Sequence, residues 1–162
     1  LDLLETLPYV DAKRGFGAIG HSLGGHNALF TAAFEQRIRA VVTSCGFTAF
    51  HHYYGGKLAG WTSSRYMPRI RDVYENDPDQ VPFDFYEVLA AIAPRGVYIN
   101  APLGDSNFDV AGVRKVVEQV GGVYRLLEAG EQLRAVYPDS GHDFPPAVRT
   151  EAYDWLDQVL GR

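Results

Sequence analysis

Serine, aspartate and histidine, the side chains that share the work of nucleophilic catalysis, stand beside turn-forming residues in this 162-residue chain. Ser22 lies in the run Gly20-His21-Ser22-Leu23-Gly24, between an apolar segment and a helical pattern. Asp105 follows a glycine, and His142 stands in the run Gly141-His142-Asp143-Phe144. A serine hydroxyl attacks well when a histidine accepts its proton and a carboxylate holds the other histidine nitrogen. These residue types, each beside a turn, therefore predict acyl transfer.

The position of Ser22 depends on the elements around it. The run 15–19 predicts a short buried strand, and residues 23–35 predict a helix with small side chains on one face. Gly20 and Gly24 are expected to let the strand and the helix approach closely, so that the serine hydroxyl projects above the end of the sheet. A serine in such a turn is a nucleophile elbow.

Later segments alternate between strand and helix patterns. Strands are predicted at 39–44, 96–101 and 133–137, and helices from Phe85 to Ile92, from Val110 to Val120 and after Pro145-Pro146. Residues 1–7 are typical of the last turns of a helix. Alternation of this kind predicts a parallel sheet with right-handed crossovers. Asp105 and His142 follow the third and fourth strands, so both fall at the carboxyl edge of that sheet.

With its strand-turn-helix context, and with acid and histidine following in that order, the chain resembles the α/β-hydrolase family. It is most similar to the dienelactone-hydrolase, acetylxylan-esterase and prolyl-oligopeptidase-like branches. The resemblance implies an α/β fold, a three-layer αβα sandwich with a mostly parallel sheet of about four strands. It also implies that Ser22 is the nucleophile, His142 the base and Asp105 the acid. The main-chain N–H of Leu23 would be an oxyanion donor, and no metal or organic cofactor is implied.

The resemblance covers nearly all of the chain but matches only the carboxyl-terminal portion of a typical α/β hydrolase. In this family a second oxyanion donor comes from a loop well upstream of the elbow. We therefore expect residues 1–162 to form one amino-terminally truncated domain. The elbow strand, normally central, would then lie at an edge of the sheet.

Each candidate also has a simpler interpretation. Ser22 could cap the helix that follows it, and His142 could be an ordinary loop histidine. Asp109 is an alternative triad acid, or the N-cap of the helix that starts there. The histidines His26, His51 and His52 are expected to pack or to form hydrogen bonds rather than to bind a metal. Cys45 is expected to be a small core residue.

The segment 47–82 loses any regular period and is rich in aromatic residues, glycine and proline. A loop-rich segment of this length is usually functional, and we interpret it as a cap over the site. Its Tyr53, Tyr54 and Trp61, together with His21 beside the nucleophile, are candidates for the substrate pocket. The cap aromatics could equally form the core of the cap itself.

Composition narrows the class of function. The chain is 46% hydrophobic and 22% charged with a formal net charge of -5, which is ordinary for a globular domain and gives no basic patch for nucleic acid. No apolar run is long enough for a membrane span. The favoured hypothesis is a serine hydrolase acting on a small-molecule or carbohydrate-linked ester. The alternatives are a prolyl-oligopeptidase-like peptidase and a non-catalytic binding module on the same scaffold. The single cysteine leaves the compartment undecided.

Overall fold

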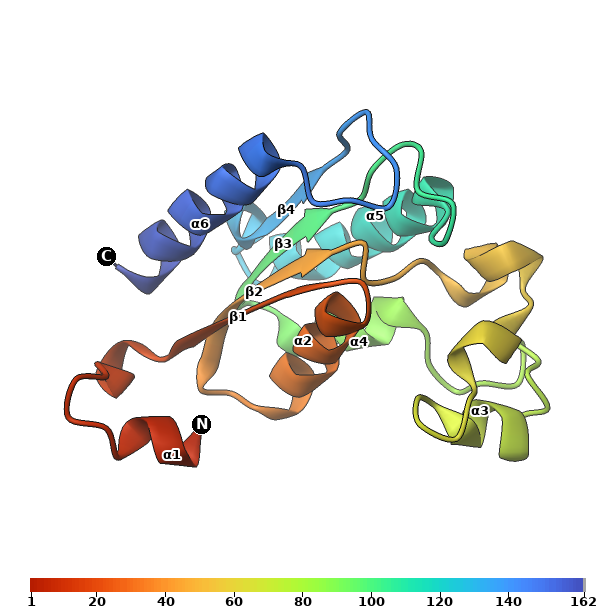
Figure 1. Ribbon diagram of the computed structural model, residues 1–162, viewed down its shortest axis with the longest axis horizontal. Coiled ribbons are helices and arrows are strands. Elements are labelled where there is room, and N and C mark those ends of the chain that lie inside the picture. Colours follow the sequence, from red (N-terminus) through yellow and green to blue (C-terminus); the bar gives the residue numbers. More distant parts are fainter. Residues whose placement is uncertain (162) are drawn as a thin grey trace.

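A parallel four-stranded sheet forms the centre of the computed structural model, which describes residues 1–161 (Figure 1). The strands are β1 (Phe16–His21), β2 (Ile38–Ser44), β3 (Gly96–Asn100) and β4 (Leu133–Val136), and they lie side by side in chain order. The predicted four-stranded parallel sheet is confirmed. Because β1 pairs only with β2 among the described residues, the elbow strand lies at an edge.

Helices cover both faces of the sheet. One face carries α2 (Leu23–Phe34), α4 (Phe85–Ile92) and α5 (Val110–Leu126), and the other carries α6 (Pro146–Leu160) (Figure 1). The three-layer αβα arrangement is therefore confirmed, although α5 continues to Leu126, beyond the predicted end at Val120. A short helix α1 (Asp2–Glu5) precedes the sheet.

The alternation of side chains along β2 explains why both faces need a helix layer. Val41 packs toward α2 in the larger core, while Ala40 and Val42 pack with Tyr98 and Trp155 under α6. Successive strand residues point to opposite faces, so a strand buried on both sides reads as a continuous apolar run. β2 therefore needs a helix layer on each side of the sheet.

The segment 47–82 contains short helices that its composition did not predict. These are 3-10 turns at Phe50–Gly55 and Leu58–Trp61 and the helix α3 (Pro68–Asp72). Two further 3-10 turns lie at Ala12–Arg14 and Gly130–Gln132. In Figure 1 the segment lies beyond the carboxyl ends of the strands, on the right. Within residues 1–161, no helix combines the length and the apolar character needed to cross a bilayer.

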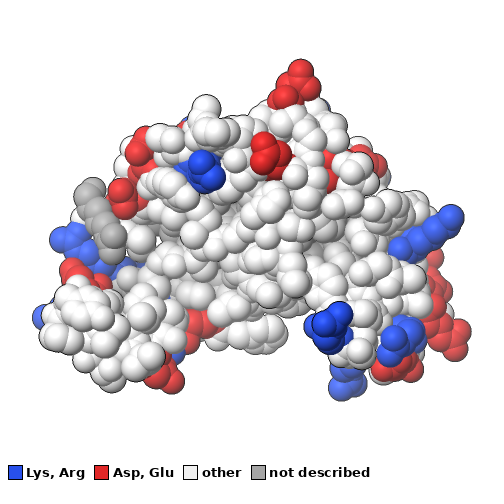
Figure 2. Space-filling view, viewed as in Figure 1, with Lys and Arg blue, Asp and Glu red and all other residues white. Residues whose placement is uncertain are grey.

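Charged side chains of both signs occur around the periphery of the face seen in Figure 2, and its middle is largely uncharged. Exposed apolar side chains of β1 and α2 include Ile19, Leu23 and Phe34, which are 44%, 52% and 88% exposed. An edge strand with apolar neighbours exposes both backbone groups and apolar surface, a combination that favours association with other chains.

His26 of α2 is a buried histidine enclosed by aromatic rings. Its ring is 4.6 Å from that of Phe30 and 4.8 Å from that of Tyr66, and its Nδ1 has no hydrogen-bond partner within the described part of the chain. Burial disfavours the charged imidazolium and lowers the pKa of His26 to about 4. The neutral form is therefore the one that fits the core.

We expect this histidine to make the fold acid-sensitive. The unfolded chain takes up the His26 proton near pH ~6.5, while the folded chain resists it down to about 4, so the stabilisation is complete above pH ~6.5 and is lost as the pH falls toward 4. The difference is about 3 kcal/mol in the free energy of unfolding. Urea denaturation between these pH values gives the free energy of unfolding of the protein and of His26→Phe. This free energy should fall more steeply with decreasing pH in the unmodified protein than in the variant. Equal slopes for both proteins would contradict this assignment.

Candidate active site

The backbone at Ser22 has the conformation expected of a nucleophile elbow. Ser22 joins the end of β1 to the start of α2 with φ 53° and ψ -120°, a left-handed region that a non-glycine residue seldom adopts. Its carbonyl accepts the N–H of His26, but its side chain makes no capping hydrogen bond to the helix. The hydroxyl is therefore not used as an N-cap and is available to another partner.

The two glycines of the motif do not play equal parts. A Cβ at Gly20 would lie 2.1 Å from the backbone of Gly24, and one at Gly25 would lie 2.8 Å from Oγ1 of Thr43. A Cβ at Gly24 would meet no described atom within 4 Å. The expectation that Gly24 permits the close approach was wrong. Gly20 and Gly25 are the residues that let α2 pack against the strands, because their missing side chains face backbone and core atoms.

A pair of alanine substitutions tests this distinction. Gly20→Ala should lower the free energy of unfolding by about 3 kcal/mol or more, because the Gly24 backbone it would strike is held in a helix. Gly24→Ala should leave stability unchanged or raise it by up to ~1 kcal/mol, the usual gain of alanine over glycine in a helix. Thermal and urea denaturation measure both. Similar losses for the two variants would contradict this view of the elbow.

His142 lies between Ser22 and Asp105 and contacts both. Its Nε2 is 3.0 Å from Oγ of Ser22, and its Nδ1 is 3.0 Å from each carboxylate oxygen of Asp105. A carboxylate accepts hydrogen bonds only, so Nδ1 carries the proton, and the unprotonated Nε2 accepts the serine O–H. The arrangement can draw a proton from the hydroxyl while the carboxylate faces the developing imidazolium.

The structure places Asp105, and not Asp109, against the histidine. The Asp105 side chain is 2% exposed, and its Oδ1 also accepts the backbone N–H groups of Asn107 and Phe108, which fix its orientation. Asp109 instead caps α5 by accepting the N–H of Ala111. The N-cap interpretation of Asp109 is thus the one that the geometry favours.

Leu23 begins α2, directly after the serine. The first N–H groups of a helix have no acceptor within the helix and lie at the positive end of its dipole. The N–H of Leu23 is therefore available to an oxyanion formed beside Ser22.

The aromatic candidates of the segment 47–82 divide into two groups. Tyr53 and Trp61 are 7% and 1% exposed and stack on each other with ring centroids 4.0 Å apart, so they form core rather than the lining of an open pocket. Trp61 also stacks on Phe108, whose ring lies 5.8 Å from that of His142. Trp61 and Phe108 therefore pack behind the His142 ring as part of the core. Tyr54 is 54% exposed and lines a small cavity beside the loop that carries Asp105.

Sequence reasoning missed a row of polar residues across the strand ends. His21, Ser44 and Asn100 are the last residues of β1, β2 and β3 and are register partners of one another. Nδ1 of His21 is 3.0 Å from Oγ of Ser44, and Nδ2 of Asn100 donates to the same Oγ at 2.8 Å. The available signal was a polar residue ending each of three apolar runs. We name these three residues the strand-end row.

Cys45 lies beside the triad residues as a protonated thiol. Burial, followed by the nearby Asp105 carboxylate, raises the pKa of Cys45 to about 12, and its Sγ donates to the carbonyl of Asp143 at 3.3 Å. Ligand atoms of Cys45, Asp105 and His142 lie within 4.8 Å of one another, a spacing that a metal ion could bridge. A zinc ligand must be the thiolate, whereas this environment favours the thiol and engages the other two groups in hydrogen bonds. The donor set therefore suits a hydrogen-bonded site better than a metal site.

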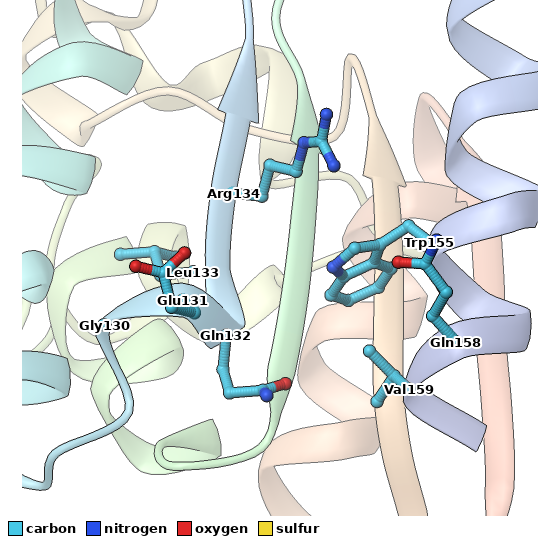
Figure 3. Close-up of a pocket in the computed structure, with 8 residues that line it drawn as sticks. All are labelled: Gly130, Glu131, Gln132, Leu133, Arg134, Trp155, Gln158 and Val159. Atoms are coloured by element: carbon cyan, nitrogen blue, oxygen red, sulfur yellow. The ribbon is translucent and has the colours of Figure 1, made fainter. Parts of the chain in front are cut away.

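A cavity of about 510 Å³ lies away from these residues. It is lined by the turn before β4, by the first residues of that strand and by Trp155, Gln158 and Val159 of α6 (Figure 3). This is the amino end of the parallel strands, whereas α/β folds place reactive groups at the carboxyl end. The contacts of His142 with Ser22 and Asp105 lie at the opposite edge of the sheet.

Comparisons with known proteins agree with the fold. No protein-family model matches the chain. It is 27% identical over 164 residues to the putative hydrolase YtaP of Bacillus subtilis strain 168, covering 98% of this chain and 52% of that protein. The glucuronoyl esterase from Solibacter usitatus superposes with a TM-score of 0.77 at 23% identity, covering 98% of this chain and 45% of that one.

A second solved structure gives the same result. A carbohydrate esterase family 15 glucuronoyl esterase from Caldicellulosiruptor kristjansonii superposes with a TM-score of 0.79 at 22% identity, covering 98% of this chain and 47% of that one. The chain thus spans about half the length of the proteins it matches. From its sheet, its elbow and these likenesses, the chain is a relative of the α/β hydrolases and carries part of the α/β-hydrolase fold.

Proposed function

We propose that this chain is a serine hydrolase that cleaves carboxylic esters through an acyl-enzyme on Ser22. The observation that carries the proposal is the double contact of His142, with Nε2 at the Ser22 hydroxyl and Nδ1 at Asp105, each at 3.0 Å. Residues so far apart in the sequence meet in a geometry with a specific chemical use. The hydrolase relatives support the same class of reaction.

The reaction follows from these contacts. Oγ of Ser22 attacks the ester carbonyl while its proton passes to Nε2 of His142, and Asp105 stabilises the imidazolium. The N–H of Leu23 donates to the oxyanion of the tetrahedral intermediate. His142 then gives its proton to the leaving alcohol, so that the acyl group stays on Ser22. A water molecule, deprotonated by His142, attacks the acyl carbonyl and releases the acid.

The proposed substrate class is a carbohydrate-linked ester, and the segment 47–82 is the proposed cap. Two of the similar structures are glucuronoyl esterases, which supports the first part. A cavity of about 220 Å³ between the cap residues His52 and Tyr54 and the loop of Asp105 supports the second. The cap would therefore bind part of the substrate beside the triad acid.

Pre-steady-state hydrolysis of para-nitrophenyl acetate tests the proposed reaction. We expect a burst of para-nitrophenol approaching one equivalent per chain, followed by slower turnover, because the good leaving group makes acylation of Ser22 faster than deacylation. The matched anilide, para-nitroacetanilide, should react far more slowly if the enzyme is an esterase. A faster anilide reaction would favour the peptidase alternative, and hydrolysis unchanged by loss of Ser22 would exclude the mechanism.

A further inference from the structure

The strand-end row connects the core of the sheet to the rim of the proposed active site. Asn100 is 1% exposed, Ser44 is completely buried, and His21 is exposed beside Ser22. The ring of His21 lies 5.0 Å from the ring of His142. The strand-end row has no part in the proposed reaction, although its outer residue, His21, lies next to both Ser22 and His142.

The direction of each hydrogen bond in the row follows from its inner end. Asn100 places one amide atom 3.0 Å from the carbonyl of Asp143 and 2.8 Å from Oγ of Ser44. A carbonyl oxygen only accepts, so this amide atom must be the donor Nδ2. Ser44 therefore accepts from Asn100 and keeps its own proton to donate.

Two acceptors compete for the Ser44 proton. Nδ1 of His21 lies 3.0 Å away, whereas Sγ of Cys45 lies 3.9 Å away and is a weak acceptor. The ring nitrogen is the closer and stronger of the two acceptors, and a Ser44 hydroxyl that donates to it requires an unprotonated Nδ1 on His21. Partial burial, followed by the proximity of His142, lowers the pKa of His21, against the opposing effects of Asp143 and Asp105. A neutral ring with an unprotonated Nδ1 carries its proton on Nε2.

We infer that the strand-end row holds His21 as the Nε2–H tautomer, and that this N–H binds an acceptor oxygen on the leaving alcohol of the substrate. The bond to Ser44 engages Nδ1, so Nε2 is the nitrogen left for a ligand. His142 delivers its proton to the leaving oxygen in the proposed mechanism, and His21 is the ring beside it. A sugar that leaves as the alcohol offers further hydroxyl and ring oxygens at that place, whereas a simple alkyl alcohol offers none. His21 is thus a specificity-determining residue, an inference that rests on the proposed function.

The tautomer can be measured without any activity. In protein labelled with nitrogen isotope in its histidines, the chemical shifts of the two His21 ring nitrogens should show a protonated Nε2 and an unprotonated Nδ1. In Ser44→Ala, which removes the donor, the Nδ1–H form should become populated. An Nδ1–H tautomer in the unmodified protein, or a tautomer that Ser44→Ala leaves unchanged, would overturn the inference.

The binding role is measured as a ratio of rates. The ratio of kcat/KM for glucose acetylated on its primary hydroxyl to kcat/KM for ethyl acetate should fall about tenfold in His21→Phe, with KM carrying most of the change, as expected for one lost hydrogen bond. His21→Gln, which keeps an N–H at a similar reach, should retain most of the ratio. Equal ratios in the unmodified protein and His21→Phe would refute the binding role. The burst of acylation on Ser22 tests the proposed function separately. Its absence would contradict the proposed function, whereas the nitrogen shifts of His21 would still test the tautomer.

Discussion

Ser22→Ala should lower kcat for ester hydrolysis on the order of 10⁶-fold, to the level that binding and oxyanion stabilisation alone supply. Alanine removes the oxygen that lies 3.0 Å from Nε2 of His142 and leaves no other hydroxyl in that contact among the described residues. Steady-state rates with para-nitrophenyl acetate measure the loss. Denaturation should show that the variant still folds, because the Ser22 side chain supports no helix cap.

Ser44→Ala is the matched control for this prediction. Ser44 is the last residue of β2 and the register partner of His21, the neighbour of Ser22, but its hydroxyl contacts His21 and Asn100 rather than Nε2 of His142. Its loss should cost no more than about tenfold, the effect of one hydrogen bond. Comparable losses for the two variants would contradict the assignment of the nucleophile.

Asp105→Asn should lower kcat about 10⁴-fold, because an amide at this position can donate to Nδ1 and stabilise the wrong tautomer of His142. The residue is well suited to this test, since its orientation is fixed by the N–H groups of Asn107 and Phe108. Those two hydrogen bonds can be made to the carbonyl oxygen of asparagine. The change should therefore appear in kcat with little loss of stability.

Asp109→Asn provides the corresponding control. Asp109 lies on the same loop and caps α5, and asparagine caps a helix as well as aspartate does. We expect kcat to stay within a few-fold of the value of the unmodified protein. The free energy of unfolding should stay within ~0.5 kcal/mol. A larger loss of kcat at Asp109 than at Asp105 would identify Asp109 as the acid and overturn the arrangement described above.

Most of the fold could be predicted because its signals are local. The apolar run before Ser22, the helical spacing after it and the alternation of later elements each depend on neighbouring residues. The order of serine, acid and histidine then placed all three at one sheet edge. The sequence favoured Asp105 but left Asp109 open as an alternative, because both lie in one loop and only the path of the chain turns one carboxylate toward His142.

The unpredicted features depend on contacts between distant segments. The close contact at Gly20 and the open space at Gly24 depend on how α2 packs against the strands, and the spacing of two glycines around a serine does not encode that packing. Tyr53 and Trp61 are buried because the segment 47–82 folds onto Phe108 and Phe85, which follow it in the chain. The strand-end row requires the register of three strands separated by whole helices. Such pairings follow from tertiary packing and not from local pattern.

Covalent labelling by a fluorophosphonate, mapped by mass spectrometry of the folded protein, tests the central claim most directly. The probe reports an activated serine whatever the natural ester is. We predict a single adduct on Ser22, absent in Ser22→Ala and formed much more slowly in His142→Ala. An adduct on another residue, or none on a folded protein that hydrolyses esters, would contradict the claim that His142 and Asp105 activate Ser22.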